Sequence, residues 1–233
     1  MDCLITVIGS VFNGFGIVAT SGSDIIIDWG DKNKEIVIGT GVNQDINHKY
    51  NSPENKNIVI SGEEILELNF GDSYAPNQLL RISNLPDSLI LLGVVGQLLI
   101  ELPPLPQTLE SLSCRQNQIT DLPELPQALQ FLNCGNNQLT ELPNLPPLLS
   151  NLSCRHNKLT TIPTLPLSLL SIKVIENQIS VSEINQALIE LDTNGQINGT
   201  IEFNTQTPSA PPSGLGIIAK ANLISKGWTI ITD

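Results

Sequence analysis

Basic residues, aromatic side chains and long apolar runs are all scarce in this chain of 233 residues. It carries 11 Lys and Arg against 23 Asp and Glu, and the resulting net charge of −12 argues against general binding to nucleic acids or anionic membranes. The longest apolar run, residues 89–100, is interrupted by two glycines and a glutamine and is shorter than the roughly 20 residues that span a bilayer. The sequence therefore predicts no membrane span and no nucleic-acid partner.

Signals for catalysis, cofactors and export are equally sparse. The two histidines fall in different regions, no serine or cysteine stands in a nucleophile motif, and Gly14-Phe15-Gly16 lacks the third glycine of a dinucleotide fingerprint. We therefore expect no enzyme, no cofactor and no metal ligand set. Met1 to Leu4 begin no Sec-type signal, so the localisation stays open between the cytoplasm, a non-Sec route and transport in a phage particle.

What the chain does contain is a repeat of 20 residues. Three copies are nearly alike, a worn copy begins at Leu89 and another at Leu169, and each clear copy follows a Leu-Pro-x-Leu-Pro segment. The clear copies are 109–120, 129–140 and 149–160. So short a unit cannot bury an apolar side alone, so the period predicts coils that stack on one another.

Each copy contains a short alternation that predicts a strand with two inward residues. The predicted inward residues are Leu112 and Cys114, Leu132 and Cys134, and Leu152 and Cys154. We expect these cysteines to be free and buried, because a straight row of sulfurs does not supply a tetrahedral zinc site. Four asparagines recur where the chain leaves the strand, and they are expected to bond open backbone groups: Asn117, Asn137, Asn157 and Asn177. The proline segments predict extended returns instead of helices.

The combined pattern, L-x-x-L-P-x-L-P-x-x-L-x-x-L-x-C-x-x-N-x-L-T, resembles the short bacterial class of leucine-rich repeat. This resemblance implies an α/β solenoid that is mostly β, with one parallel sheet. We predict three domains: a small all-β sandwich at 1–64, the solenoid at 65–180, and a βα C-terminal cap at 181–233.

Residues 1–64 have no 20-residue period and instead alternate strand-like runs with Gly and Asn turns, which predicts the sandwich. The predicted runs are 4–8, 16–19, 24–29, 35–38 and 57–60. Asp28-Trp29-Gly30-Asp31, followed by His48-x-Tyr50, resembles the signature of PKD-like β-sandwiches, although Lys32 replaces the usual glycine. The resemblance implies a core Trp29 with His48 and Tyr50 beside it. Calcium on Asp28, Asp31 and Asp45 is an open alternative, but the spacing is not that of an EF-hand.

The segments that flank the repeats are predicted to complete the solenoid. Residues 65–70 mimic a repeat strand and are expected to be the first one. After Thr160 the returns become helical: Ser182 is the predicted N-cap of a helix at 183–192, and Gly227 the C-cap of a helix at 214–226. Strands are expected at 196–203 and 228–231. The segment from Asn198 to Thr229 resembles the closing segment of phage-borne and bacterial surface leucine-rich proteins.

The outward strand positions of such a solenoid form a rigid concave face, and this face is the predicted site. Three of the four basic residues between 85 and 180 fall on it. The predicted contact residues are Ser111, Ser113, Arg115, Phe131, Asn133, Asn151, Ser153, Arg155, His156 and Lys173. We predict a non-enzymatic interaction module that binds a protein or a glycan. The alternative is a structural virion or envelope component, such as a phage decoration, fibre or tail-associated protein, attached by its N-terminal sandwich within a larger assembly.

Overall fold

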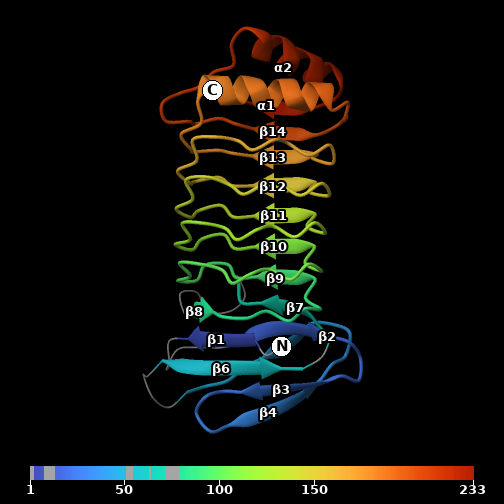
Figure 1. Ribbon diagram of the computed structural model, residues 1–233, viewed down its shortest axis with the longest axis vertical. Helices are drawn as coiled ribbons and strands as arrows, with labels where there is room; N and C mark the ends of the chain where they lie inside the picture. Colours follow the sequence, from blue (N-terminus) through green and yellow to red (C-terminus); the bar gives the residue numbers. More distant parts are fainter. Residues whose placement is uncertain (1–2, 8–13, 51–54, 63, 72–78) are drawn as a thin grey trace. The chain divides into compact units, whose positions relative to one another are not determined.

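The computed structural model describes residues 3–7, 14–50, 55–62, 64–71 and 79–233. The chain divides into two compact units, Met1–Ile119 and Thr120–Asp233, referred to below as the N-terminal and C-terminal units. Figure 1 shows short strands stacked as rungs in both units.

The N-terminal unit contains an antiparallel sheet and part of a second sheet. The antiparallel sheet has the order β4 (Lys34–Ile38), β3 (Asp24–Asp28), β6 (Lys56–Ser61), β1 (Cys3–Val7) and β8 (Leu79–Ile82). The second sheet runs β5 (Gln44–Ile46), β2 (Phe15–Ala19), β7 (Ile65–Asn69), β9 (Leu91–Gly93) and β10 (Ser111–Ser113). β2 pairs antiparallel with β5 and β7, whereas β7, β9 and β10 are parallel.

An aromatic cluster lies in the core of this unit. The ring of Phe15 lies 5.1 Å from that of Phe70 and 6.1 Å from that of Trp29, which follows β3. The cluster therefore joins residues of both sheets. Each strand-like run predicted before residue 70 contains a strand, and the two strands that were not predicted are β5 and β8. β5 is only three residues long and begins with Gln and Asp, so it has no hydrophobic alternation to identify it.

The run at 65–70 is the first parallel strand, as predicted. In β7, Leu68 is in register with Leu92 of β9, and both side chains are fully buried. β7 also pairs with β2, so the sheet continues across the predicted boundary after residue 64. The division into 1–64, 65–180 and 181–233 stays a prediction.

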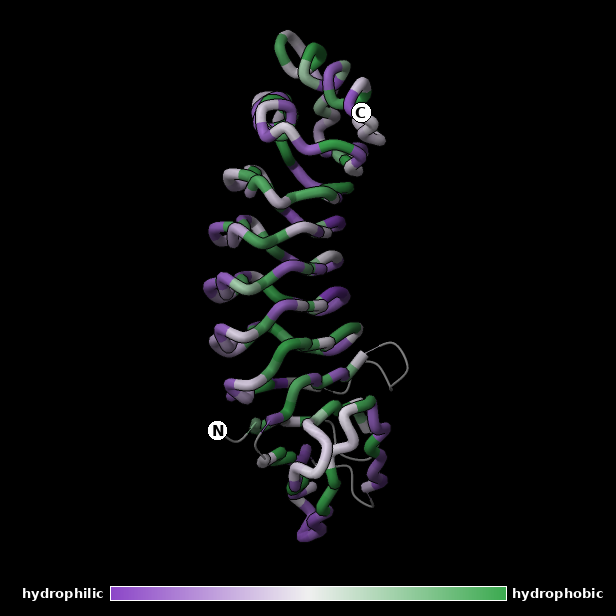
Figure 2. The backbone as a smooth tube through the Cα atoms, turned by 90° about the vertical axis from the view of Figure 1, so that its right-hand side faces the viewer, coloured by the Kyte–Doolittle hydropathy of each residue, from purple (hydrophilic) through white to green (hydrophobic). Residues whose placement is uncertain are grey.

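The C-terminal unit is a parallel-stranded solenoid. Its strands, in order, are β11 (Phe131–Asn133), β12 (Asn151–Ser153), β13 (Ser171–Lys173), β14 (Thr200–Glu202) and β15 (Thr229–Ile231). The helix α1 (Val181–Thr193) lies between β13 and β14 in the chain, and α2 (Leu215–Ser225) lies between β14 and β15. The predicted mostly-β solenoid with a parallel sheet is confirmed, and Figure 2 shows apolar residues recurring along its successive coils.

The middle residue of each repeat strand faces the core. Leu132, Leu152 and Ile172 are aligned in register and at most 2% exposed. Cys134 and Cys154 are free thiols and fully buried, as predicted from their place in the repeat. In the N-terminal unit Leu112 and Cys114 are buried in the same way.

The proline-rich returns contain neither helix nor strand, again as predicted. Each return ends in a tight turn in which the leucine N–H donates to a proline carbonyl. These bonds are Leu129 to Pro126, Leu149 to Pro146 and Leu169 to Pro166, each 3.1 Å long. Because proline lacks an N–H, an extended return leaves few donors to satisfy.

Three predicted element boundaries were wrong. The N-cap of α1 is Ser180 and not Ser182: the Ser180 hydroxyl accepts a hydrogen bond of 3.3 Å from the Glu183 N–H, and Ser182 lies in the first turn of the helix. The strand predicted at 196–203 is shorter, because β14 covers only Thr200–Glu202. The second helix covers Leu215–Ser225 and not 214–226, and its C-cap is Lys226; Gly227, predicted as the C-cap, is the residue after the cap and has the left-handed φ of 86° that is typical there.

Candidate functional site

The strand face of the C-terminal unit contains a hollow of about 280 Å³. In β11, β12 and β13 the middle residue is buried and the two flanking residues point to this face, because side chains alternate along a strand. The hollow is lined by Phe131, Asn133, Asn151, Leu152, Ser153, Arg155, Ser171 and Lys173. Amides, hydroxyls, two cations and one aromatic ring therefore lie together on the face.

Most of the ten predicted contact residues border a hollow. Six of them line the hollow of the C-terminal unit: Phe131, Asn133, Asn151, Ser153, Arg155 and Lys173. Ser111, Ser113 and Arg115 line a separate hollow of about 220 Å³ in the N-terminal unit, together with Asn69, Gly71, Leu91, Leu92, Gly93 and Val95. His156 lines neither of these two hollows. Binding at these positions stays a prediction.

Arg155 is the cation of this face with the most freedom to meet a partner. Its side chain is exposed, and its guanidinium makes no hydrogen bond or ion pair with any residue that the structure describes. The aliphatic stem of Arg155 lies over Gly135 of the preceding rung, where an added Cβ would approach Arg155 Cγ to 3.0 Å. Phe131, 39% exposed, lies on the same face.

The other two predicted basic side chains of this unit each face an acid. Lys173 Nζ lies 2.6 Å from a Glu202 carboxylate oxygen, and His156 Nδ1 lies 2.7 Å from one of Glu176. The backbone of His156 has a φ of 53°, and this left-handed turn explains why its side chain leaves the row formed by the strand residues. The positive character expected of the face is therefore concentrated, in the C-terminal unit, at Arg155.

The recurring asparagines bond the backbone, as predicted. Asn157 Nδ2 donates to the carbonyls of Cys134 and Cys154 at 3.1 and 3.0 Å, and its Oδ1 accepts a bond of 3.0 Å from the Leu139 N–H. Asn177 makes the same three kinds of contact one rung later. These amides are structural, because each satisfies buried backbone groups at a turn.

The predicted cluster around Trp29 is present in the N-terminal unit. His48 stacks on Trp29 with a centroid distance of 4.4 Å, and Tyr50 donates a hydrogen bond of 2.8 Å to the Trp29 carbonyl. His48 Nε2 lies 2.8 Å from an Asp31 oxygen. Burial would raise the pKa of Asp31, but hydrogen bonds from His48 and from the Asn33 N–H outweigh it, so the pKa is lowered.

The turn carboxylates that were considered for calcium have protein partners. Asp28 accepts a hydrogen bond of 3.0 Å from the Gly30 N–H and forms an ion pair of 3.0 Å with Lys34. Asp45 accepts a bond of 3.1 Å from the Asn43 side chain. Over the described part of the chain, no group of three or more His, Cys, Asp or Glu side chains could hold a metal ion.

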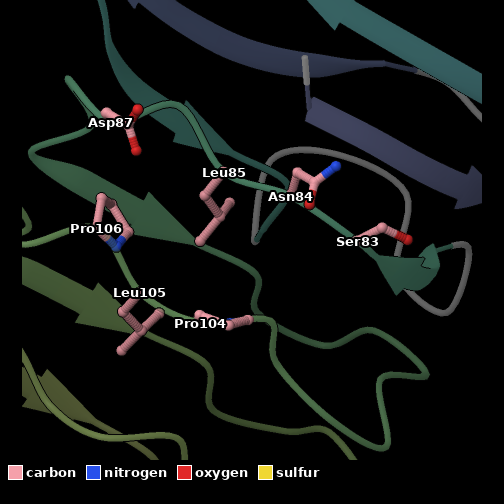
Figure 3. A pocket seen from close by; sticks show the side chains of 7 residues that line it. All are labelled: Ser83, Asn84, Leu85, Asp87, Pro104, Leu105 and Pro106. Carbon is pink, nitrogen blue, oxygen red and sulfur yellow. The ribbon is translucent and has the colours of Figure 1, made fainter. Parts of the chain in front are cut away.

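Hollows also recur along the proline-rich returns. Figure 3 shows one in the N-terminal unit, with a volume of about 270 Å³, which is lined by Ser83, Asn84, Leu85, Asp87, Pro104, Leu105 and Pro106. A second, of about 260 Å³, lies between 144–147 and 163–166 in the C-terminal unit. Leucine, proline and small polar residues dominate both linings, so neither presents a reactive set of side chains. Among the described helices, neither α1 nor α2 has the length and hydrophobicity that a bilayer span requires.

Comparison with known proteins identifies the repeat. Residues 107–147 match a family model described as "Leucine Rich repeats (2 copies)", so this segment contains leucine-rich repeats. The search of curated proteins gave no match.

Three solved structures are similar to parts of the chain. YopM from Yersinia enterocolitica WA-314 is 40% identical over 42% of this chain, with a TM-score of 0.41, and the chain spans only 22% of it. A Shigella effector LRR domain is 26% identical, covers 71% of this chain and 80% of that one, and has a TM-score of 0.49. YopM from Yersinia pestis, a leucine-rich effector protein, is 37% identical over 41% of this chain and 34% of that one, with a TM-score of 0.36. The PKD-like resemblance, the closing segment and the virion alternative stay predictions.

Proposed function

We propose that this chain is a non-enzymatic module that binds a protein partner through the strand face of its leucine-rich-repeat solenoid. The observation that carries the proposal is the hollow on the C-terminal unit, where an exposed Phe131 lies among amides and hydroxyls together with Arg155, whose guanidinium pairs with none of the described residues. Leucine-rich-repeat domains are interaction modules in general, and the repeat match supports this class of function.

Residue chemistry favours a protein as the ligand. Arginine and aromatic residues dominate the binding energy of protein interfaces, because they combine large contact area with directional hydrogen bonding. An acidic residue of the partner would pair with Arg155 in preference to Lys173, because Glu202 already neutralises Lys173. Asn133, Asn151 and Ser153 supply both donors and acceptors, which suits a polar rim around such contacts.

The lining of this hollow also supports a role without catalysis. It holds no carboxylate, imidazole, thiol or phenol that could act as a general base on the hydroxyls of Ser153 and Ser171, and its one amine, Lys173, is paired with Glu202. A face of this kind can bind and orient a ligand. A neutral glycan could use the same amides, but it has no anionic group to pair with Arg155, so we favour the protein.

The test uses the full chain as bait against extract from the native source, with four baits in parallel. These are the wild type, Arg155→Glu, Phe131→Ala and the control Lys158→Glu, which reverses an exposed cation outside the hollow. We expect one protein to be retained by the wild type and by Lys158→Glu and to be lost from the other two. With that protein purified, each substitution in the hollow should weaken binding by about 2 kcal/mol, roughly 30-fold.

Circular dichroism of all four baits controls for folding. A partner that binds Arg155→Glu and Phe131→Ala as tightly as the wild type would exclude this face. A photo-crosslinker at Asn151 provides an independent measurement, because a partner seated in the hollow must react there.

A further inference from the structure

Gly135 brings two side chains of the C-terminal hollow together. A Cβ added at Gly135 would lie 3.0 Å from Arg155 Cγ and 3.4 Å from Asn133 Oδ1, so both side chains border the space that the missing Cβ leaves. The φ of Gly135 lies outside the left-handed region, and the equivalent positions of the next two rungs hold Arg155 and Ile175. Glycine is therefore needed at this position for space and not for backbone conformation.

The amide of Asn133 is held with its donor toward the hollow. Asn133 Oδ1 accepts a hydrogen bond of 3.3 Å from the Gly135 N–H, which leaves Nδ2 as the atom that faces a ligand. Within the described part of the chain, Asn133 Nδ2 donates to no residue. The hollow therefore has two neighbouring sets of available donors, the amide of Asn133 and the guanidinium of Arg155.

The charge of the hollow matches one carboxylate. No acid in the described part of the chain neutralises Arg155, whereas Lys173 Nζ lies 2.6 Å from a Glu202 oxygen, so the lining has one available positive charge. A carboxylate has one negative charge and two oxygens, so the guanidinium and the Asn133 amide can both donate to it. A phosphate monoester carries a charge of nearly −2 at neutral pH, and its second charge would have no partner beside Glu202.

The rest of the lining suits the residues on either side of such a carboxylate. Phe131 is 39% exposed and offers its ring to an apolar side chain. Asn151 Nδ2 donates to Ser150 Oγ at 2.8 Å, so Asn151 Oδ1 is left to accept a backbone N–H. A protein segment supplies an acid, an apolar side chain and backbone N–H groups within a few residues.

We propose that the hollow binds an aspartate or glutamate side chain of the protein partner, with its carboxylate between Arg155 and Asn133 Nδ2. An apolar neighbour of that acid packs on Phe131. Gly135 is a positioning residue, because it leaves room for the aliphatic stem of Arg155 and its N–H holds the Asn133 amide. This inference rests on the proposed function and adds the chemical class of the group that is bound.

Random 12-residue peptides displayed on phage and selected against the full chain test the proposal. Peptides that bind the wild type and not Phe131→Ala should be enriched in Asp or Glu beside an apolar residue. In fluorescence anisotropy, Asn133→Asp should weaken such a peptide by at least roughly tenfold, because an oxygen replaces Nδ2 and repels the carboxylate. Asn144→Asp, the same change at an exposed return position outside the hollow, should bind as the wild type does. A peptide in which Gln replaces Glu should bind the wild type and Asn133→Asp alike.

Gly135→Ala tests the positioning role. The added Cβ displaces Arg155, so peptide binding should weaken by at least roughly threefold. In an Arg155→Ala background the same substitution should change binding by less, since the Cβ acts through Arg155. An equal loss in both backgrounds would assign Gly135 a merely structural role.

The outcomes separate this inference from the proposed function. Peptides that depend on Phe131 but are not enriched in acids would overturn the carboxylate site and leave the binding face in place. If no selected peptide loses affinity for Phe131→Ala or Arg155→Glu, both proposals fail. Displacement of the peptide by a sialylated glycan or a phosphopeptide, but not by an unmodified acidic peptide, would also overturn the inference, because the anion would then belong to another class.

Discussion

At the scale of single residues, side-chain amides hold the turn that follows each repeat strand. Each amide donates hydrogen bonds to backbone carbonyls that the turn would otherwise leave without a partner. In the described part of the chain these residues are Gln97, Asn117, Asn137, Asn157, Asn177 and Gln206. The amide at Gln206 was not predicted, because 29 residues instead of 20 separate it from Asn177. Its Nε2 donates to the Val174 carbonyl and its Oε1 accepts from the Ile179 N–H, as the asparagines do.

Removal of one such amide should be costly. In Asn157→Ala the Leu139 N–H and the Cys134 carbonyl lose buried partners, so we expect a loss of at least about 2 kcal/mol in the free energy of unfolding. Urea denaturation measures the loss. Asn144→Ala, at an exposed return position, is the control and should change stability by less than about 0.5 kcal/mol. Equal stability of Asn157→Ala and the wild type would contradict a structural role for the amide row.

The cysteines are chemically protected by their place in the core. Burial raises the pKa of Cys3, Cys114 and Cys154 to about 12, and Cys134 is fully buried as well. Since the thiolate is the reactive form, the native protein should react with a disulfide reagent at about pH 8 only as fast as it opens or unfolds. All four thiols should react at once in concentrated urea. A fast-reacting thiol in the native protein would show that one of these sites is open to solvent.

At the scale of elements, the two helices of the C-terminal unit are joined through Asp192 near the end of α1. One Asp192 oxygen lies 2.6 Å from Lys226 Nζ, and the other accepts a hydrogen bond of 2.8 Å from Asn222 at the end of α2. Close approach of the helices depends on Gly216, where an added Cβ would lie 2.0 Å from Asn185 Oδ1. The contact between α1 and α2 therefore needs a small residue, Gly216, at the beginning of α2 and an ion pair, Asp192 with Lys226, at the end of α2.

This ion pair predicts a pH-dependent stability. Burial alone would raise the pKa of Asp192, but hydrogen bonds from Asn222 and Lys226 and the charge of Lys226 lower it overall. Because the pKa of Asp192 is lower in the folded than in the unfolded protein, its ionised carboxylate stabilises the fold at pH values above the unfolded-state pKa of about 3.9. This stabilisation is lost as the pH falls through the folded-state pKa. Asp192→Asn should therefore cost about 1 kcal/mol at neutral pH, since the pair is partly exposed, and almost nothing near pH 2.

Urea unfolding of the wild type and Asp192→Asn at both pH values provides the measurement. Asp121→Asn, at an exposed corner of the repeat, is the control and should show no such difference. A cost for Asp192→Asn that persists in acid would assign the effect to shape and not to charge.

At the scale of the whole molecule, the solenoid is stabilised rung by rung. In the C-terminal unit each inward residue contacts the matching residues of its neighbours through the register Leu132, Leu152, Ile172, Ile201 and Ile230. Stability of such an array depends on nearest-neighbour contacts, so damage to one rung should spread first to the rungs beside it.

Leu152→Ala tests this behaviour. The substitution leaves a cavity in the core, because the Leu152 side chain is only 2% exposed. We therefore expect the free energy of unfolding to fall by about 2–5 kcal/mol. Hydrogen exchange should accelerate in β11 and β13, on either side of β12, before it does so in β15. Uniform acceleration over the whole unit would instead indicate that all its rungs open together. Leu148→Ala, at a half-exposed return position, is the control.

The sequence by itself determined the repeat, the inward leucines and cysteines, the asparagine row and the extended returns. It could do so because a solenoid is nearly one-dimensional: a residue's neighbours are the same positions one period away, so local periodicity already fixes the contacts. The parallel register of Leu68 with Leu92 was predictable for the same reason, although an insertion lengthens that interval to 24 residues.

Only the tertiary structure decided the features that join residues without a common period. These are the pairing of β2 with β7, the place of Gln206 in the amide row, and the neutralisation of Lys173 by Glu202, which leaves Arg155 as the cation of the C-terminal hollow that no described acid neutralises. It also revealed that Ile217, Ile218 and Ile224 of α2 are more than half exposed. Distance along the chain does not encode such contacts, because each depends on where separate segments meet after the coils have stacked.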